Sequence, residues 1–145
     1  MTVSARHQAF FQLYDALKPG NTSAELLRLV YADDVIFIDP FHQKHGIDEL
    51  EVYFTGLYEN VTEIRFNFGR VIEQDNHSCV QWLMTFKHPA LQKGQQEIDV
   101  NGVTLIEWQN DKIVRHQDVF DGGEMLYQHI PVLGWAINKI KDRMQ

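Results

Sequence analysis

The period of the hydrophobic pattern changes from mainly helical to alternating just after Asn60, and that change limits the possible folds more than any other feature. Before it, apolar residues recur at helical spacing, as they do over residues 10–17 and 50–57. After it, apolar and polar residues alternate, as over residues 64–68 and 79–86, which is typical of strands with one buried face. Helices gathered early and strands gathered late predict an α+β domain in which helices pack on one sheet.

Turn and capping residues divide this pattern into elements. Thr22 and Glu25 have the spacing of a capping box, which predicts the start of a short second helix. Pro131 stands where helices commonly begin, which predicts a terminal helix. The clusters "QDNHS" and "QNDK" carry turn residues between antiparallel strands. In chain order, the predicted elements are helices ending at residue 17 and over 24–32, a strand over 35–39, a helix over 46–60, strands over 64–68, 79–86, 97–108 and 112–121, and a helix from 131 onward.

The composition suits one compact domain over residues 1–145. A chain of this length with 44% hydrophobic residues can bury a sizeable core. Its 13 basic and 20 acidic residues leave a net charge of −7, which disfavours binding to nucleic acid. The amino-terminal segment has no apolar signal core, and no stretch approaches the length of a membrane span. We therefore expect a cytoplasmic protein without stable membrane association, in which the lone Cys79 forms no internal disulfide.

Asp39 ends the apolar run "VIFID" and is followed at once by Pro40. The proline restricts Asp39 to an extended conformation, so its side chain is expected to share a face with Val35 and Phe37. If that face lines an apolar cavity, desolvation makes the carboxylate a better proton acceptor near neutral pH. The alternative is a turn cap, in which the carboxylate accepts hydrogen bonds from the backbone N–H groups that follow the proline.

Two segments resemble a known superfamily. The stretch "YADDVIFIDPFHQKHG", residues 31–46, is similar to proteins of the nuclear transport factor 2-like superfamily, and especially to ketosteroid isomerases. The stretch "HQDVFDGGEMLYQHIPVLGW", residues 116–135, is similar to SnoaL-like proteins. The resemblance in element order covers nearly the whole chain. It implies a conical, curved mixed or antiparallel sheet wrapped around the N-terminal helices, an apolar pocket at the open end, and a homodimer.

The same resemblance assigns roles to particular residues. Asp39 matches the general base of ketosteroid isomerases, and Tyr14 matches the tyrosine that donates a hydrogen bond to the developing oxyanion. Asp118 matches the catalytic acid/base of SnoaL-like cyclases, and His116 shares its strand face. If both carboxylates point into one apolar site, they can serve as acid and base. The alternatives are that Tyr14 is a core residue of its helix and that Asp118 pairs with Arg115 or caps its strand.

The sequence also departs from two enzymes of the superfamily. Thr104 stands where ketosteroid isomerases carry a second, protonated acid, and Asn101 lies three residues earlier. The Arg and Asp that limonene epoxide hydrolases carry on a middle strand have no match in "CVQWLMTF". These departures argue against both activities, although Asn101 and Thr104 remain candidates for contact with a ligand.

Apolar strand residues are the candidates for the wall of the pocket. They are Phe37, Phe66, Trp82, Met84 and Phe120. His42 and His45 follow Asp39 at intervals of three, but a loop gives such side chains no reason to converge, so we expect no metal site and no cofactor. The terminal helix combines apolar and basic residues; we expect it to cover the sheet or a dimer interface rather than to lie on a membrane.

Two functions of different classes fit these residues. The first is a cofactor-independent enzyme that transfers a proton on a lipophilic carbonyl or hydroxyl compound, in the manner of an isomerase or cyclase. Asp39 is then the base, Tyr14 the hydrogen-bond donor, and Asp118 or His116 the second acid. The second is a binding module that holds an apolar ligand or a protein partner, in which the polar residues only orient what is bound.

Overall fold

The computed structural model describes residues 4–61, 63–91, 96–126 and 130–144. Five helices and six strands form the α+β arrangement that the sequence predicts. In chain order they are α1 (Ala5–Ala16), α2 (Ala24–Leu27), β1 (Tyr31–Ile38), β2 (Gln43–His45), α3 (Gly46–Asn60), β3 (Glu63–Gln74), β4 (His77–Lys87), β5 (Ile98–Gln109), β6 (Lys112–Phe120), α4 (Gly122–Met125) and α5 (Leu133–Arg143).

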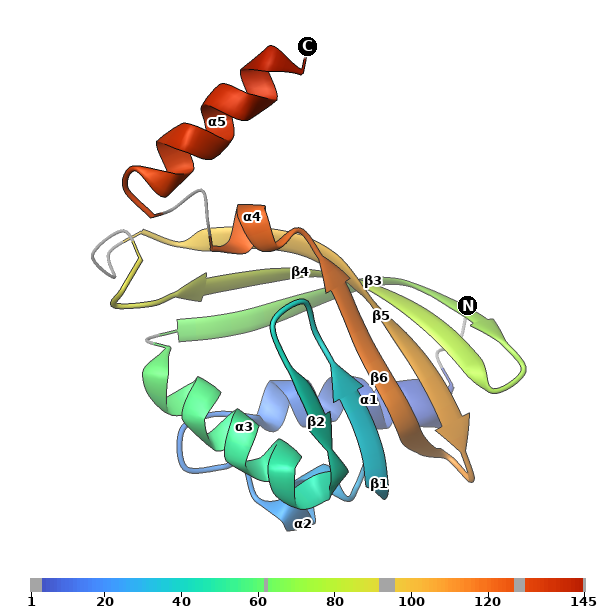
Figure 1. The fold of residues 1–145 in the computed structure, drawn as a ribbon. Coiled ribbons are helices and arrows are strands. Elements are labelled where there is room, and N and C mark those ends of the chain that lie inside the picture. The colour runs from blue at the N-terminus through green and yellow to red at the C-terminus, as the bar shows by residue number, and fades with distance from the viewer. Residues whose placement is uncertain (1–3, 62, 92–95, 127–129, 145) are drawn as a thin grey trace.

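The strands form one curved, unclosed sheet in the order β2-β1-β6-β5-β4-β3. Every neighbouring pair is antiparallel except β1 and β6, which run parallel, with Phe37 opposite His116. Helices α1 and α3 lie on the concave side, so the sheet wraps around them as a cone does (Figure 1). The expectation of a conical mixed sheet around N-terminal helices is therefore confirmed.

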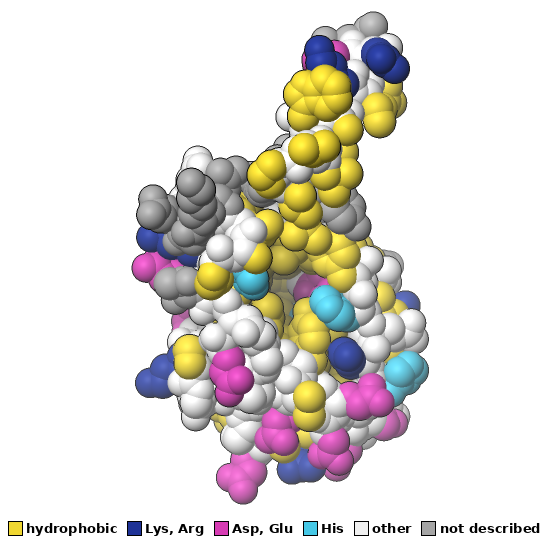
Figure 2. Space-filling view, turned by 60° about the vertical axis from the view of Figure 1, so that its left-hand side comes forward, with side chains coloured by type: hydrophobic (Ala, Val, Ile, Leu, Met, Phe, Trp, Pro, Cys, Tyr) yellow, Lys and Arg dark blue, Asp and Glu magenta, His cyan; other side chains and the backbone are white. Residues whose placement is uncertain are grey.

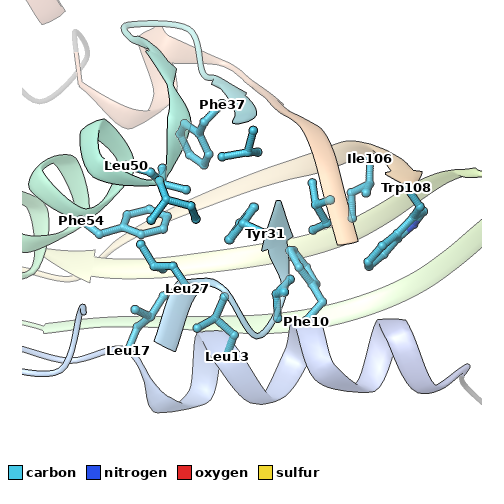
Figure 3. Close-up of a cluster of buried hydrophobic side chains, with 14 of the residues drawn as sticks. Phe10, Leu13, Leu17, Leu27, Tyr31, Phe37, Leu50, Phe54, Ile106 and Trp108 are labelled. Atoms are coloured by element: carbon cyan, nitrogen blue, oxygen red, sulfur yellow. The ribbon is translucent and has the colours of Figure 1, made fainter. Parts of the chain in front are cut away.

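The main core fills the narrow part of this cone, between α1, α3 and the sheet (Figure 3). Phe10 and Leu13 on α1 face Tyr31 on β1, and Leu50 and Phe54 come from α3. All five are at most 3% exposed. Since burying one large apolar side chain contributes roughly 1.5–3 kcal/mol, this cluster is the principal reason that the helices stay on the sheet.

The second helix differs from its prediction. It covers only four residues, because Tyr31 and Ala32 belong to β1 and not to a helix reaching residue 32. The capping box is also wrong: the Ser23 hydroxyl caps the helix by accepting from the Leu26 N–H at 3.2 Å. The Thr22 hydroxyl is instead hydrogen-bonded to that of Thr55 on α3, at 2.7 Å. Tertiary packing therefore decided which hydroxyl faces the helix end.

The terminal helix is also placed differently. It begins at Leu133, two residues after Pro131, and it projects away from the sheet (Figure 1). The Trp135 side chain is 66% exposed and lies under the ammonium of Lys139. The expectation that the tail covers the sheet of its own chain is wrong, because α1 and α3 already occupy the concave side. None of the helices that the structure describes is long and apolar enough to cross a membrane.

Candidate functional site

A cavity of about 440 Å³ opens at the wide end of the cone, between the inner sheet face, α3 and α4. Figure 2 shows it as a hollow bordered by hydrophobic side chains, with histidines at its rim and an acidic side chain inside. Its aromatic wall includes Phe37, Phe54, Phe66, Trp82, Phe86 and Phe120. The polar groups that reach it are Tyr14, Asp39, His42, Tyr53, His88 and Asp118. An apolar cavity with a few convergent polar groups is the usual form of a small-molecule site.

Asp39 both caps a turn and lines this cavity. Its Oδ1 accepts hydrogen bonds from the backbone N–H groups of Phe41 and His42, at 2.8 and 2.7 Å. Its Oδ2 accepts from the Tyr53 hydroxyl at 2.7 Å. The carboxylate is only 7% exposed, and it stays in place because these donors replace water. The turn interpretation therefore describes the hydrogen bonds of Asp39, and the extended run before Pro40 explains its inward direction.

Asp118 lies near the C-terminal end of β6, and its carboxylate has different hydrogen-bond donors from that of Asp39. Its Oδ1 accepts from the Thr104 hydroxyl at 2.6 Å and from His116 Nε2 at 2.7 Å. Among the residues that the structure describes, no hydrogen bond reaches its Oδ2. The Arg115 guanidinium donates to Gln117 at 3.4 Å instead of pairing with Asp118. Asp118 thus enters the cavity with one oxygen oriented by the protein and the other available to a ligand.

A chain of hydrogen bonds runs from Asp118 back into the core. His116 is 1% exposed, and its Nδ1 lies 2.9 Å from the Tyr31 hydroxyl. The Tyr31 hydroxyl lies 2.8 Å from that of Tyr14. In the neutral form of His116, which has one N–H, the carboxylate can only accept, so Nε2 carries the proton and Nδ1 accepts from Tyr31. Tyr31 in turn accepts from Tyr14, so all the donors point toward Asp118.

The hydrogen bond between Tyr14 and Tyr31 bears on whether Tyr14 can donate to a ligand. Tyr14 lines the cavity, as the oxyanion-donor hypothesis requires, but its hydroxyl is hydrogen-bonded to that of Tyr31 at 2.8 Å. Burial raises the pKa of Tyr14 and of Tyr31 well above the ordinary value, so both phenols remain neutral donors. Burial, together with the Asp39 carboxylate, likewise raises the pKa of Tyr53, which therefore keeps its hydrogen bond to Asp39.

The structure places the remaining candidates in three groups. Phe37, Phe66, Trp82, Met84 and Phe120 line the cavity. Thr104 lies behind it, where its hydroxyl accepts from Trp82 Nε1 at 2.8 Å and donates to Asp118. Asn101 is exposed on the outer face of the sheet, away from the cavity. Asn101 and Thr104 are three positions apart on one strand, so the alternation of side chains puts them on opposite faces.

Sequence reasoning missed Tyr31 and Tyr53 as partners of the site. Tyr53 was visible only as part of the apolar stripe of its helix, and Tyr31 as the end of a helix. No local signal separates a core tyrosine from one whose hydroxyl reaches a carboxylate. Over the described ranges, no three His, Cys, Asp or Glu side chains converge as metal ligands, and His45 is hydrogen-bonded to Gln43.

Solved structures similar to this chain share its cone-like fold. A nuclear transport factor 2-like protein of unknown function from Burkholderia pseudomallei superposes with a TM-score of 0.73 at 20% identity, covering 90% of this chain and 100% of its own. A protein with a ketosteroid isomerase-like fold from Catenulispora acidiphila, in complex with trimethylamine, has a TM-score of 0.73 at 14% identity over 88% and 94% of the two chains. TerC, co-crystallised with polyporic acid, has a TM-score of 0.67 at 17% identity over 81% and 92%.

The fold is thus the one that nuclear transport factor 2-like proteins share. The model of the SnoaL-like domain matches residues 10–116, which is most of the chain, so the protein belongs to the SnoaL-like family. Comparison with curated proteins finds no match to the sequence. The family establishes a fold that holds small molecules, and the chemistry has to be argued from the site.

Proposed function

We propose that the protein is a cofactor-independent enzyme that transfers a proton on a lipophilic carbonyl or hydroxyl compound bound in the cavity. The observation that carries this proposal is the pair of carboxylates, Asp39 and Asp118, in one largely apolar cavity. Two such groups in one site can divide the roles of acid and base. Membership of the SnoaL-like family supports the proposal, as do neighbours of the same fold that hold polyporic acid or trimethylamine.

Asp118 is the stronger candidate for the proton acceptor. Its Oδ2 is open to a ligand, whereas both oxygens of Asp39 accept hydrogen bonds from the turn or from Tyr53. His116 donates to Oδ1 and so orients the carboxylate. A proton taken from an acidic C–H or O–H of the ligand comes to Oδ2 and can return to another atom of the same ligand. Asp39 then serves as the second polar group that positions the substrate.

The alternative is a binding module without catalysis. It is favoured by the Tyr14 hydroxyl, which is hydrogen-bonded to Tyr31 in the core. In that case the cavity holds an apolar ligand, and Asp39 and Asp118 orient it. The two functions differ in one property: only the enzyme removes a proton from carbon.

Hydrogen–deuterium exchange tests this difference without knowledge of the product. A panel of bicyclic and tricyclic ketones is incubated in D₂O with the protein, and loss of the α-proton signals is followed by NMR. We expect accelerated exchange in at least one ketone that also raises the melting temperature, and loss of that acceleration in Asp118→Asn. Stabilising ligands without any exchange would leave the binding module as the function.

We also propose that the protein is a cytoplasmic homodimer formed through the outer face of the sheet. Ile72, Leu105 and Val119 are 60%, 43% and 44% exposed on β3, β5 and β6. Exposed apolar side chains on one face of a sheet suit an interface between copies. Light scattering at micromolar concentration should give the mass of a dimer, and Leu105→Glu should give that of a monomer. A wild-type monomer under these conditions would exclude the dimer.

A further inference from the structure

The charges around the cavity are of one sign. Asp39 and Asp118 line it together with two histidines, His42 and His88, of which His42 Nδ1 lies 3.1 Å from Asp39 Oδ1, and among the described residues of its wall there is no Lys or Arg. Lys44 lies outside the lining, with its ammonium 5.9 Å from the ring centroid of Tyr53. The chain as a whole carries a net charge of −7. A ligand anion would therefore enter a site of like charge in a low-dielectric environment, which strengthens the repulsion.

The Oδ2 atom of Asp118 provides a hydrogen-bond acceptor at a fixed position in this negatively charged cavity. Thr104 and His116 both donate to Oδ1, so the carboxylate cannot rotate without losing two hydrogen bonds of 2.6 and 2.7 Å. Oδ2 is left toward the cavity as an acceptor at a fixed position. An N–H or O–H of a ligand satisfies it, and a charged N–H forms the stronger hydrogen bond because the acceptor is ionised.

The wall of the cavity also suits a positive charge. Phe120 lies beside Asp118 on β6, and its ring contacts those of Trp82 and Phe41, with centroids 5.9 and 6.2 Å away. The faces of aromatic rings attract cations, most strongly where water is excluded. Aromatic surface next to a carboxylate offsets the cost of removing an ammonium group from water, a cost that a purely aliphatic pocket would not offset.

We propose that the ligand of this cavity is a lipophilic amine, bound as its ammonium form with an N–H donated to Asp118 Oδ2 and with its apolar body against the aromatic wall. This inference rests on the proposed function only in placing the ligand in the cavity. It adds a class of ligand that is bound and not turned over: a cation at neutral pH, which binds in preference to a neutral or anionic compound of the same shape and occupies the oxygen that would accept a proton from a substrate.

A matched set of ligands tests the proposal. Naphthylmethylamine, naphthylmethanol and naphthoate, substituted at the same ring position, present a cation, a neutral donor and an anion on one apolar body. Their affinities for the full chain are measured by isothermal titration calorimetry at neutral pH. We expect the amine to bind about tenfold more tightly than the alcohol, and the carboxylate to bind more weakly than the alcohol.

Two Asp→Asn variants locate the preference. Asp118→Asn should remove the preference for the amine and leave the affinity of the alcohol nearly unchanged. Asp99→Asn is the matched control, because Asp99 also lies on a strand and accepts from a threonine, Thr85 at 2.7 Å, but it is outside the cavity. It should leave all three affinities unchanged. If Asp118→Asn does not fold, the proposal is tested by the order of the three affinities in the wild type and by Asp39→Asn, in which we expect a smaller loss of the preference for the amine.

Each result separates this proposal from the function above. Binding of the alcohol as tightly as the amine, or tightest binding of the carboxylate, overturns the cation proposal and leaves the cavity as a site for lipophilic ligands. An amine preference that survives in Asp118→Asn overturns the anchoring role of Oδ2. Failure of all three compounds to bind overturns the cation proposal and leaves the proposed function to the exchange experiment with ketones.

Discussion

Two buried histidines, His7 on α1 and His116 on β6, have similar surroundings and different consequences. Each is 1% exposed, and each uses both ring nitrogens in hydrogen bonds. His7 lies between the hydroxyls of Ser4 and Ser78, at 2.5 and 2.8 Å, and Trp108 donates to the same Ser78 hydroxyl at 2.9 Å. That cluster ties α1 to the sheet, and it reaches no cavity that the structure describes.

His116 is, like His7, a buried histidine with both ring nitrogens hydrogen-bonded, but its partners differ from those of His7. Its Nε2 is hydrogen-bonded to Asp118, a carboxylate that lines a cavity, whereas both ring nitrogens of His7 are hydrogen-bonded to hydroxyls and the nearest carboxylate oxygen, Glu73 Oε2, lies 3.9 Å from Nδ1 and outside that cavity. A buried, satisfied histidine is therefore not evidence of a site by itself. What distinguishes a site is that the chain of hydrogen bonds ends at an ionisable acceptor that a ligand can reach.

The largest expected effect separates the two clusters by activity. Asp118→Asn should lower the rate of catalysed exchange by about 100-fold or more, because general acid–base groups contribute on that scale. Ser78→Ala, in the other cluster, should change the rate by less than about twofold at a temperature where both variants are folded. NMR exchange rates on the same ketone measure both. Equal losses in the two variants would mean that the rate reports folding and not chemistry.

The second prediction compares the histidines by stability. His116→Leu should lower the free energy of unfolding by about 3 kcal/mol, because it removes one of the two hydrogen-bond partners of the Tyr31 hydroxyl and one of the two donors to a partly buried carboxylate oxygen, Asp118 Oδ1. Urea denaturation followed by tryptophan fluorescence gives the value. A loss smaller than that of the corresponding His7 variant would mean that a chain of hydrogen bonds ending at a carboxylate stabilises the fold no more than one ending at hydroxyls.

A smaller loss in the free energy of unfolding is expected when the imidazole of His7 is removed. His7→Leu should cost about 1–2 kcal/mol, because Ser78 keeps the hydrogen bond from Trp108 when the imidazole is removed. The same urea titration measures it. Binding of stabilising ligands should be unaffected, since His7 is not part of the cavity wall; weaker binding would connect the two clusters in a way that the structure does not.

The smallest effect concerns pH. Burial lowers the pKa of His7 below its ordinary value; the nearby Glu73 opposes this shift, and Arg6 adds to it. The unfolded chain therefore binds the proton more readily than the folded chain. The stability contributed by neutral His7 is complete above the ordinary histidine pKa and is lost as the pH falls through it toward the folded-state value. Calorimetry at pH 7.5 and 5.5 should show a smaller decrease of Tm in His7→Leu than in the wild type.

Much of the fold was visible in the sequence because it depends on local pattern. The alternation over residues 98–108 predicts that Thr104 and Ile106 share the inner face, and the same rule places His116 and Asp118 together on β6. The rule applied to Asn101 would have placed it outside. The turn at Asp39 was likewise visible, because the following proline and the short carboxylate act within three residues.

The boundary between α2 and β1 shows where local pattern ends. Residues 24–32 have a helical distribution of apolar groups, yet Tyr31 pairs with Ile113 of β6 and is buried in the sheet. A strand pairing more than eighty positions away in the sequence outweighed a weak helical preference. The same pairing explains why Tyr31 was missed as a partner of His116.

The sequence by itself determined the four long strands after residue 60, the alternation of side chains along them, and the candidacy of Asp39 and Asp118 as inward carboxylates. These follow from side-chain direction and turn chemistry, which operate over a few residues. The tertiary structure decided which of these groups meet. The parallel pairing of β1 with β6 sets Phe37 opposite His116 and brings Tyr31 within 2.9 Å of the imidazole. Pairings between distant strands are fixed by the packing of the whole core, and no short stretch of sequence records that packing.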